Sequence, residues 1–486
     1  MHLVLPPPPI GYDPVPPSWE TGTIVLLPSL SFPVTELTKI TGIDHYEERL
    51  LCSILLLARP DLRIVYLTSQ AVDREIVDYH LGFLPDPGAA RRRLHLVAVG
   101  EAGPRPLTHK LLDRPDILDR VRTLVSDDAG AALLPFNVTP AEWTLASALG
   151  LPLDGPRAEL VALGSKTGSR RVARRAGVEV LDGEEGLGSV EEVAAALERL
   201  RRRRPEVATA VVKLNLGFSG QGNALVDLTA AEPLSAGSTT FCAAGESWSS
   251  FAGKIGAEGA VVEEVAPAPV ASPSAQVRIN PDRGVHVVST HDQVLGGPGG
   301  HVYLGCRFPA DATYRMAITE AALEVGRVLA GEGVVGPFGV DFLVLPGAEG
   351  GGGGSTVALS EINLRLGGTT HPFWMARLVT GGRYEPGTGE LLVDGQPRCY
   401  VATDNLKSPG LAGWSPAGAI TAVADAGLAY DATSSTGVTL HLLGALARHG
   451  KLGATCIGED QAGAEARFQA LAGLLAAVRA NAVSRP

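Results

Sequence analysis

Residues 359–372 read LSEINLRLGGTTHP and carry the most informative pattern in this chain. Glu361, Asn363 and Arg365 stand at alternating positions, so in a β-strand all three side chains leave on the same face. Upstream, GPFGVDFLVL places Asp341 in an apolar run that reads as a neighbouring strand. Carboxylate and amide oxygens on paired strands suit Mg²⁺, which takes a few protein carboxylates together with substrate phosphates. The pattern predicts a nucleotide–metal site; the alternative is the solvated face of an antiparallel strand.

Composition and charge exclude several classes of protein. The 486 residues exceed what one hydrophobic core usually covers, so roughly two to four domains are expected. The net charge of -11 argues against nucleic acid as a partner, because phosphate contacts need clustered Lys and Arg. Five cysteines without a CxxC pair indicate neither a zinc site nor a disulfide framework, and an odd count favours the reducing cytoplasm. No apolar run reaches transmembrane length, so no membrane partner is expected.

The chain divides into segments of different character. Residues 1–20 are rich in proline and predict an extended arm. Over residues 21–150, buried-strand runs alternate with amphipathic helical segments, which indicates a parallel Rossmann-like sheet. Its loops lack the GxGxxG fingerprint, so no dinucleotide is expected. Residues 396–486 form a smaller unit with helices expected near 416–427, 439–449 and 462–480.

A second motif, VVKLNLGFSGQGN, places Lys213 at the end of a strand-like run, directly before a glycine-rich loop. Glycines let the backbone come close to phosphate oxygens and direct N–H groups at them. In a Walker A loop the glycines precede the lysine and a helix follows, so this motif is of another kind. The alternative is a hairpin with a mobile turn and a snorkelling lysine. The loop consists of Gly217, Phe218, Ser219, Gly220, Gln221 and Gly222.

A third motif, AVVEEVAP, is an apolar strand that ends in two carboxylates and then prolines. Such a linker can present backbone N–H and C=O groups to the edge of an adenine. Alternatively, Glu263 and Glu264 are exposed charges.

Together these motifs resemble the ATP-grasp superfamily of carboxylate–amine ligases, over about residues 160–380. Over most of the chain the phrases are closer still to the pheganomycin-type peptide ligases. These phrases are YEERLL, GSKTGSRR, VVKLNLGFSGQGN, STHDQVLGG, GVDFLVL, EINLRLGGTTHP and TGVTLHLLGALARHGKLGATCIG. The resemblance implies a mixed α/β fold with a Rossmann-like pre-ATP-grasp domain over 21–150 and an ATP-grasp domain over 151–395. It also implies a mobile lid over about 206–265 and a small C-terminal α/β domain over 396–486.

The resemblance also gives each motif a role, with ATP and Mg²⁺, expected as two ions, as cofactors. Lys213 would contact the α and β phosphates, and the loop from Gly217 to Gly222 would close over the β and γ phosphates. A second cation would be Lys166, which we favour, or Arg170, four residues on along the same helical face. The adenine hinge would be Glu263, Glu264, Val265 and Ala266. The metal ligands would be Asp341, Glu361 and Asn363.

Two departures from the family pattern leave roles to fill. The segment after the hinge, PAPVASPSAQ, has no carboxylate, so no ribose contact is assigned. Gly339 stands where many amino-acid ligases carry an arginine, so the residue that neutralises an acyl phosphate must come from elsewhere. Arg365 and Arg278 are candidates, and Arg307 is a weaker one; a structural ion pair is the alternative for each. The acceptor pocket has further candidates, with buried structural histidines as the alternative for the last two: Gly367, Gly368, Thr369, His371 and His441.

The implied reaction is ATP-dependent amide formation. A carboxylate attacks the γ-phosphate, an acyl phosphate forms, and an amine displaces phosphate, so positioning and electrostatics carry the phosphoryl step. The resemblance implies an unusual amino-acid-like carboxylate donor and an amino-acid or peptide amine acceptor, in natural-product assembly, and a homodimer. Two alternatives are an ATP-grasp kinase acting on a hydroxyl and a catalytically silent nucleotide-binding scaffold.

Overall fold

The computed structural model describes residues 22–217, 222–230, 234, 237–243, 245–265, 269–296, 302–346 and 356–483. Several predictions lie outside these residues: the proline-rich arm over 1–20, Phe218, Ser219, Gly220 and Gln221 of the glycine loop, and Ala266 of the hinge. In the described ranges, no helix combines the length and the apolar character needed to cross a membrane.

The N-terminal part is a parallel sheet in the order β3-β2-β1-β4, which confirms the Rossmann-like prediction. Its strands are apolar runs buried by helices: β1 (Gly22–Leu27), β2 (Leu62–Thr68), β3 (Leu94–Ala98) and β4 (Ala132–Pro135). The helices are α1 (Val34–Leu37), the 3₁₀ helix η2 (Ile43–Ala58), α2 (Arg74–Leu81), α3 (Pro87–Arg92), α4 (Leu107–Leu112), α5 (Pro115–Val125) and α6 (Pro140–Leu149). Helix α6 begins at a capping box of Thr139 with Glu142 and ends at Gly150, which has a left-handed conformation.

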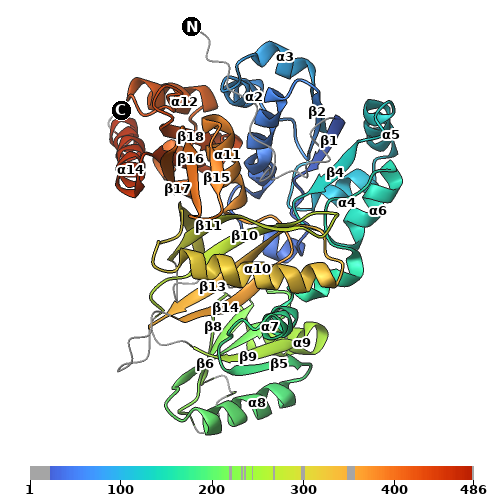
Figure 1. Cartoon of the computed structure of the whole chain (residues 1–486), viewed down its shortest axis with the longest axis vertical. Helices are drawn as coiled ribbons and strands as arrows, with labels where there is room; N and C mark the ends of the chain where they lie inside the picture. Colours follow the sequence, from blue (N-terminus) through green and yellow to red (C-terminus); the bar gives the residue numbers. More distant parts are fainter. Residues whose placement is uncertain are drawn as a thin grey trace.

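The middle of the molecule is a large antiparallel sheet, here called the central sheet (Figure 1). Its path runs β14-β13-β10-β11-β12-β17-β16-β15, and helix α10 (Arg315–Gly331) packs on β10 and β11. The strands are β10 (Pro273–Ile279), β11 (Val285–Gly296), β12 (Val302–Phe308), β13 (Gly336–Leu345), β14 (Thr356–Asn363), β15 (Arg383–Glu385), β16 (Glu390–Val393) and β17 (Gln396–Lys407). Strand β14 ends at Asn363, so Arg365 lies just beyond the predicted strand, and the buried helix α11 (Thr370–Thr380) begins after residues 364–369.

A second antiparallel sheet, here called the lid sheet, has the order β5-β9-β6-β7-β8 and forms the end of the molecule opposite the termini (Figure 1). Helix α7 (Lys166–Arg175) contacts both this sheet and β14, so it lies between the two sheets. The strands are β5 (Gly183–Leu187), β6 (Thr209–Leu214), β7 (Asn223–Asp227), β8 (Thr239–Phe241) and β9 (Ala260–Glu264). The other helical segments are η3 (Ala158–Gly164), α8 (Val190–Arg203) and α9 (Trp248–Glu258).

The C-terminal part continues the central sheet. Strand β19 (Lys451–Gly458) pairs with both β17 and β18 (Gly437–His441), and β17 pairs with β12. The helical segments are η5 (Pro409–Leu411), α12 (Pro416–Asp425), α13 (Gly444–His449) and α14 (Gln461–Val483). The helix expected over 439–449 is wrong in its first part: the GVTLH run is fully buried and pairs as strand β18, and α13 begins only at Gly444.

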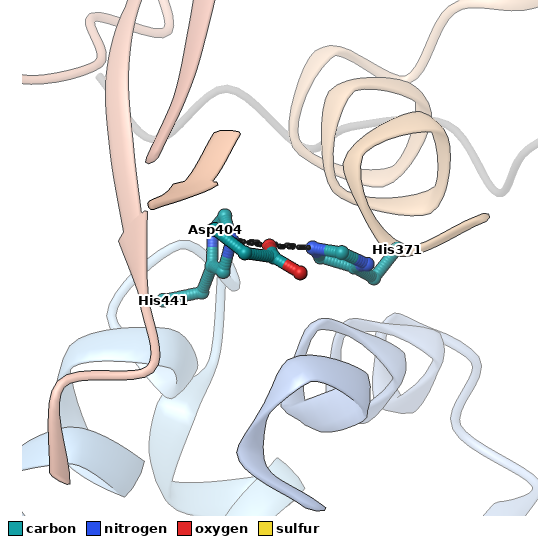
Figure 2. Close-up of side chains that lie close together, drawn as sticks. All are labelled: His371, Asp404 and His441. Carbon is teal, nitrogen blue, oxygen red and sulfur yellow. Dashed lines mark hydrogen bonds and ion pairs between the residues drawn. The ribbon is translucent and has the colours of Figure 1, made fainter. Parts of the chain in front are cut away.

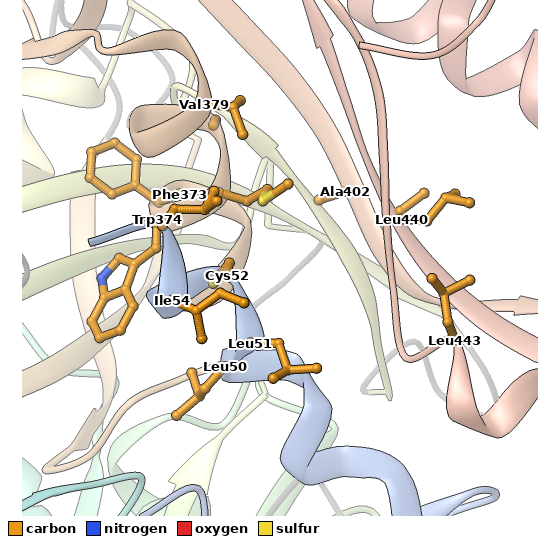
Figure 3. Packing of buried hydrophobic residues seen from close by; sticks show 14 of the residues in the cluster. Leu50, Leu51, Cys52, Ile54, Phe373, Trp374, Val379, Ala402, Leu440 and Leu443 are labelled. Atoms are coloured by element: carbon orange, nitrogen blue, oxygen red, sulfur yellow. The ribbon is translucent and has the colours of Figure 1, made fainter. Parts of the chain in front are cut away.

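One hydrophobic core joins distant parts of the chain. Figure 3 shows Leu50 and Ile54 of η2 facing Trp374 of α11, while Leu440 and Leu443 approach from the C-terminal part. The predicted domain boundaries stay a prediction, but the units on either side of residue 396 share both this core and a sheet.

Candidate active site

A cavity of about 960 Å³ lies among the central sheet, the lid sheet, the N-terminal loops and the C-terminal strands. Many of the residues singled out from the sequence line this one cavity, although they come from widely separated segments. They are Lys166, Lys213, Glu264, Val265, Asp341, Glu361, Asn363, Arg365, Gly367, Gly368 and Thr369.

The two strands predicted to carry a metal lie side by side. Asp341 of β13 stands opposite Glu361 of β14, and Asn363 Nδ2 donates a hydrogen bond of 3.0 Å to Asp341 Oδ2. Gln293 of β11 donates to the other oxygen of Asp341 at 2.8 Å. Burial, helped by the charge of Glu361, raises the pKa of Asp341 to about 7, although Arg365 and Lys166 oppose this shift. Two such carboxylates repel each other, and a divalent cation between them would relieve the repulsion, so the oxygen donors fit Mg²⁺.

Lys166 reaches the metal strands from the first turn of α7. Ser165 caps this helix by accepting a hydrogen bond from the Gly168 N–H at 3.0 Å. Lys166 Nζ lies 2.5 Å from Glu361 Oε1. Asn215, just beyond β6, fixes the helix start, because its Oδ1 accepts from the Thr167 N–H at 2.9 Å. The end of the Lys213 strand and the start of the Lys166 helix are therefore joined directly.

Lys213 and Arg170 share the buried carboxylate of Glu263. The distances are 2.5 Å from Lys213 Nζ and 2.6 Å from an Arg170 nitrogen. Burial raises the pKa of Glu263, but the charges of Lys213 and Arg170 outweigh it and the net shift is downward. Arg170 is only 1% exposed, pairs also with Glu185, and does not line the cavity. The geometry thus favours Lys166 over Arg170 as the second cation at the cavity.

Gly217 and Gly222, the two ends of the glycine loop, lie against each other. A Cβ added to Gly217 would lie 2.8 Å from Gly222 Cα, and one added to Gly222 would lie 2.6 Å from Gly217 Cα. The Leu214 N–H donates to the Gly222 carbonyl at 2.9 Å. Only glycine fits at both positions, because the two backbones touch.

The hinge carboxylates are not exposed charges. Glu263 is 2% and Glu264 7% exposed, and both lie in β9 beside β6. Glu264 pairs with Arg204 at 3.0 Å and accepts a hydrogen bond from the Asp182 N–H at 3.1 Å. The Val265 N–H donates to the Thr209 carbonyl at 3.1 Å, so this hinge backbone is fixed to the neighbouring strand.

The three candidate arginines have different surroundings. Arg365 lines the cavity, and its guanidinium donates to Asn363 Oδ1 at 2.6 Å. Arg278 forms a buried ion pair with Asp154 at 2.7 Å and is not part of the cavity wall. Arg307 lies in a half-exposed pair with Glu465 at 3.3 Å, also away from the wall. The structure therefore brings Arg365 to the site and leaves the other two in structural ion pairs.

The two candidate histidines lie behind the cavity wall. Figure 2 shows the imidazoles of His371 and His441 on either side of Asp404, with Nε2 to Oδ1 distances of 2.9 and 2.8 Å. Burial lowers the pKa of His371 to about 4, although Asp404 opposes this shift. Gly453 leaves room for the second ring, because a Cβ there would meet His441 Nε2 at 2.1 Å. Of this group, Asp404 lines the cavity and the histidines hold it in place.

These three side chains form, among the described residues, a group whose donor atoms lie close enough together to hold a metal ion. Arg49 already lies on the second oxygen of Asp404, at 3.3 Å. The carboxylate thus has a cationic partner and two imidazole donors, so hydrogen bonding accounts for the group.

Sequence reasoning missed several residues of the wall or its support. They are Arg49, Asn215, Gln293, Asp404 and Lys451. Four of them, all except Asp404, lie inside phrases that carried the family resemblance, such as YEERLL and STHDQVLGG. The family resemblance pointed to these stretches of the chain but gave these residues no role. Residues so far apart in the sequence have no fixed spacing from which their contact could be predicted.

Family models match three stretches of the chain: the Pre ATP-grasp domain over 53–151, the IQCH-like ATP-grasp over 238–383 and the PGM1 C-terminal domain over 418–471. Solved structures share the fold. A biotin carboxylase from Campylobacter jejuni in complex with β-γ-ATP has a TM-score of 0.56 at 15% identity, covering 92% of this chain and 90% of that one. The ADP complex of an N5-carboxyaminoimidazole ribonucleotide synthetase has a TM-score of 0.53 at 12% identity, covering 93% and 96%. Fold and family models together define an ATP-grasp protein.

A curated relative narrows the class. L-propargylglycine–L-glutamate ligase from Streptantibioticus cattleyicolor is 32% identical over 467 residues, which cover 93% of this chain and 94% of the relative. This chain belongs to the same family, the ATP-grasp carboxylate–amine ligases with a pre-ATP-grasp domain and a C-terminal domain of their own. It is an ATP-dependent enzyme that forms a carbon–nitrogen bond, and neither the kinase nor the scaffold alternative fits this family membership.

Proposed function

We propose that this enzyme joins an amino-acid-like carboxylate to the amine of an amino acid or peptide in natural-product assembly. The observation that carries the proposal is the convergence of Lys166, Lys213, Asp341, Glu361 and Arg365 on a single cavity. L-glutamate and L-propargylglycine, the substrates in the name of the relative, are the first pair to test.

The proposed roles follow from the positions of the side chains. Lys166 and Lys213 would bind the phosphates of ATP, and the backbone around Val265 would hold the adenine. Asp341, Glu361 and Asn363 would hold Mg²⁺, proposed as two ions. When bound, Mg²⁺ supplies positive charge to the γ-phosphoryl group as the carboxylate attacks it.

Arg365 would meet the acyl phosphate. Its guanidinium adjoins Asn363 on the cavity wall and stacks 5.5 Å from the centre of the Phe32 ring. A planar guanidinium that is fixed in this way can donate two parallel hydrogen bonds to the oxygens of a phosphate or carboxylate. Closure of the loop between Gly217 and Gly222 would exclude the water that otherwise hydrolyses the intermediate.

We also propose a cellular location, an oligomeric state and domain boundaries for this enzyme. All five cysteines are free, which supports a cytoplasmic location. A homodimer is proposed from the family alone. The domain boundaries at 150 and 395 are proposed with a lid over about 206–265.

The experiment is an ADP-release screen of carboxylate–amine pairs, with mass spectrometry of the product. Asp341→Asn and Glu361→Gln should each lower kcat by roughly 10²- to 10³-fold, because charge stabilisation at the transferred phosphoryl group is lost. Glu324→Gln, at an exposed site on α10, is the matched control and should keep full activity. Unchanged turnover in the Asp341 and Glu361 variants would sink the proposed mechanism. ADP release that needs no amine would contradict the proposed amide formation.

A further inference from the structure

One part of the cavity wall is cationic, and none of the proposed ATP or metal roles uses it. We call it the cationic end; it consists of Arg49 from η2, Lys407 from β17 and Lys451 from β19. Asp404 is the carboxylate of this part of the wall, and it already accepts hydrogen bonds from two imidazoles and from Arg49. Positive charge therefore exceeds negative charge here.

Lys451 is the residue whose position calls for a ligand. It is only 3% exposed, yet in the described part of the chain no carboxylate lies within ion-pair distance of its ammonium group. Its Nζ donates to Tyr46 Oη at 2.7 Å and to the Thr41 carbonyl at 3.2 Å, which are neutral acceptors. Burial lowers the pKa of Lys451 to about 8, although Asp404 opposes this shift. A buried ammonium without a counter-ion is unfavourable unless a bound anion completes the site.

Arg49 is held rigidly beside it. The guanidinium lies 4.7 Å from the Tyr46 ring centre and 5.1 Å from that of Phe136, and it contacts Asp404 at 3.3 Å. The same Tyr46 ring lies 4.8 Å from Lys451 Nζ, so both cations share one aromatic wall. Such fixed, partly stacked cations suit recognition of a carboxylate.

The cationic end is continuous with the proposed reaction centre. The Phe136 carbonyl accepts a hydrogen bond of 2.9 Å from the Leu366 N–H, the residue directly after Arg365. The cavity wall is therefore continuous from β13 and β14 through Arg365 to Arg49. A substrate can place its reacting group near Arg365 while a second group of the same substrate lies at the cationic end.

We propose that Arg49 and Lys451 bind a carboxylate that does not react, carried by one of the two amino-acid substrates. This inference rests on the proposed ligase function. The reacting carboxylate has to meet the γ-phosphate beside Asp341 and Glu361, so it cannot be the group held by Arg49 and Lys451. The site therefore selects substrates with a free carboxylate in addition to the group that forms the amide.

The first test replaces each free carboxylate by an amide. In one series, wild-type kcat/KM is measured for L-glutamate, L-isoglutamine and L-glutamine with L-propargylglycine as the second substrate. In the other series, it is measured for L-propargylglycine and its amide with L-glutamate as the second substrate. Amidation of the carboxylate at the cationic end should lower kcat/KM by roughly 10- to 100-fold. The substrate that shows this loss identifies the source of the carboxylate. Amidation of the reacting carboxylate removes the group that attacks the γ-phosphate, so that amide is inactive in any case. If each of the other amides reacts as well as its acid, the inference is wrong.

The second test uses Lys451→Met, which removes the charge but keeps a long apolar side chain. The variant should stay folded, since an unpaired buried ammonium is lost rather than created. With the acid, its kcat/KM should be roughly 10- to 100-fold below that of wild type. With the amide, its kcat/KM should equal that of wild type. An equal loss with acid and amide would mean a structural role. Arg327→Met, at an exposed position on α10, is the matched control and should behave as wild type.

Calorimetric titration without ATP separates this inference from the ligase proposal. L-glutamate and L-propargylglycine are titrated into wild type and Lys451→Met. At least one should bind to wild type and bind at least tenfold more weakly to the variant. Absence of binding to wild type, or equal binding to both proteins, overturns the carboxylate site. Binding without ADP release from any carboxylate–amine pair would instead contradict the ligase proposal.

Discussion

Two of the arginines predicted for the site have different surroundings. Arg365 and Arg278 both lie next to polar groups, but Arg365 is partly exposed at the cavity and Arg278 is buried against Asp154, 2.7 Å away. Sequence patterns made the two equivalent candidates. Only the tertiary structure places the Arg365 guanidinium in the cavity wall and the Arg278 guanidinium in an internal ion pair.

Arg278→Met should therefore affect stability and not chemistry. Removing the guanidinium leaves Asp154 buried without this partner, which should lower the free energy of unfolding by about 3 to 5 kcal/mol. Denaturant unfolding measures this loss, and kcat measured well below the unfolding transition should stay near the wild-type value. The double variant Arg278→Met with Asp154→Asn should recover part of the stability. A large loss of kcat at unchanged stability would instead make Arg278 part of the reaction centre.

At the scale of elements, the positions of Lys166 and Lys213 depend on one junction. The N-terminus of α7 meets the end of β6 through Asn215, whose side chain accepts from the Thr167 N–H and donates to the Glu258 carbonyl at 2.9 Å. Helix α7 also touches β14, so this junction fixes Lys166 relative to Glu361. The Asn215 side chain thus contributes to the alignment of the lid sheet with the central sheet.

Asn215→Ala should raise the KM for ATP by roughly tenfold, which corresponds to about 1.4 kcal/mol. The variant leaves the Thr167 N–H and the Glu258 carbonyl without their partner, and the start of α7 loses its support. Steady-state kinetics with varied ATP measures the effect. Gln469→Ala, which removes an exposed amide on α14, is the control and should leave the KM unchanged. An unchanged KM for ATP in the Asn215 variant would show that the Asn215 side chain does not position α7.

At the scale of the whole molecule, the three parts of the chain are stabilised by shared burial. Strand β17 extends the central sheet, and side chains of η2, α11 and β18 meet in one core (Figure 3). His291 of β11 lies inside this region, with its Nε2 2.7 Å from Tyr400 Oη of β17. Burial lowers the pKa of His291 to about 3, so the ring is neutral in the folded protein at ordinary pH.

Stability should therefore fall as the pH falls. The unfolded chain binds a proton at His291 near its ordinary pKa of about 6.5, while the folded protein does not until about pH 3, so the unfolded state binds more protons between these values. For this one group, the loss of unfolding free energy from about pH 7 to about pH 5 should be roughly 2 kcal/mol. Denaturant unfolding of wild type and His291→Gln at both pH values checks it. The variant, which keeps a polar partner for Tyr400, should lose less stability; an equal pH dependence in both proteins would contradict the assignment.

Local patterns were sufficient for much of the fold. Alternation and runs of apolar residues predicted the parallel N-terminal sheet and the paired strands that carry Asp341 and Glu361. The run over 439–449 was misread as one helix, because a short buried apolar segment has no period that separates strand from helix. Only its pairing with β19 makes the first half a strand.

By itself, the sequence determined the residue chemistry of this ligase: the carboxylates and amide on alternating positions, the lysine before its glycine loop and the apolar strand that ends in two glutamates. Each of these features spans only a few consecutive residues, and within such a span strand geometry fixes which side chains share a face. The tertiary structure alone decided that Lys166 rather than Arg170 lines the cavity, that Arg365 rather than Arg278 does so, and that Arg49, Asp404 and Lys451 meet there. Such contacts join segments hundreds of residues apart, and they exist only because the sheets and the shared core bury those segments together.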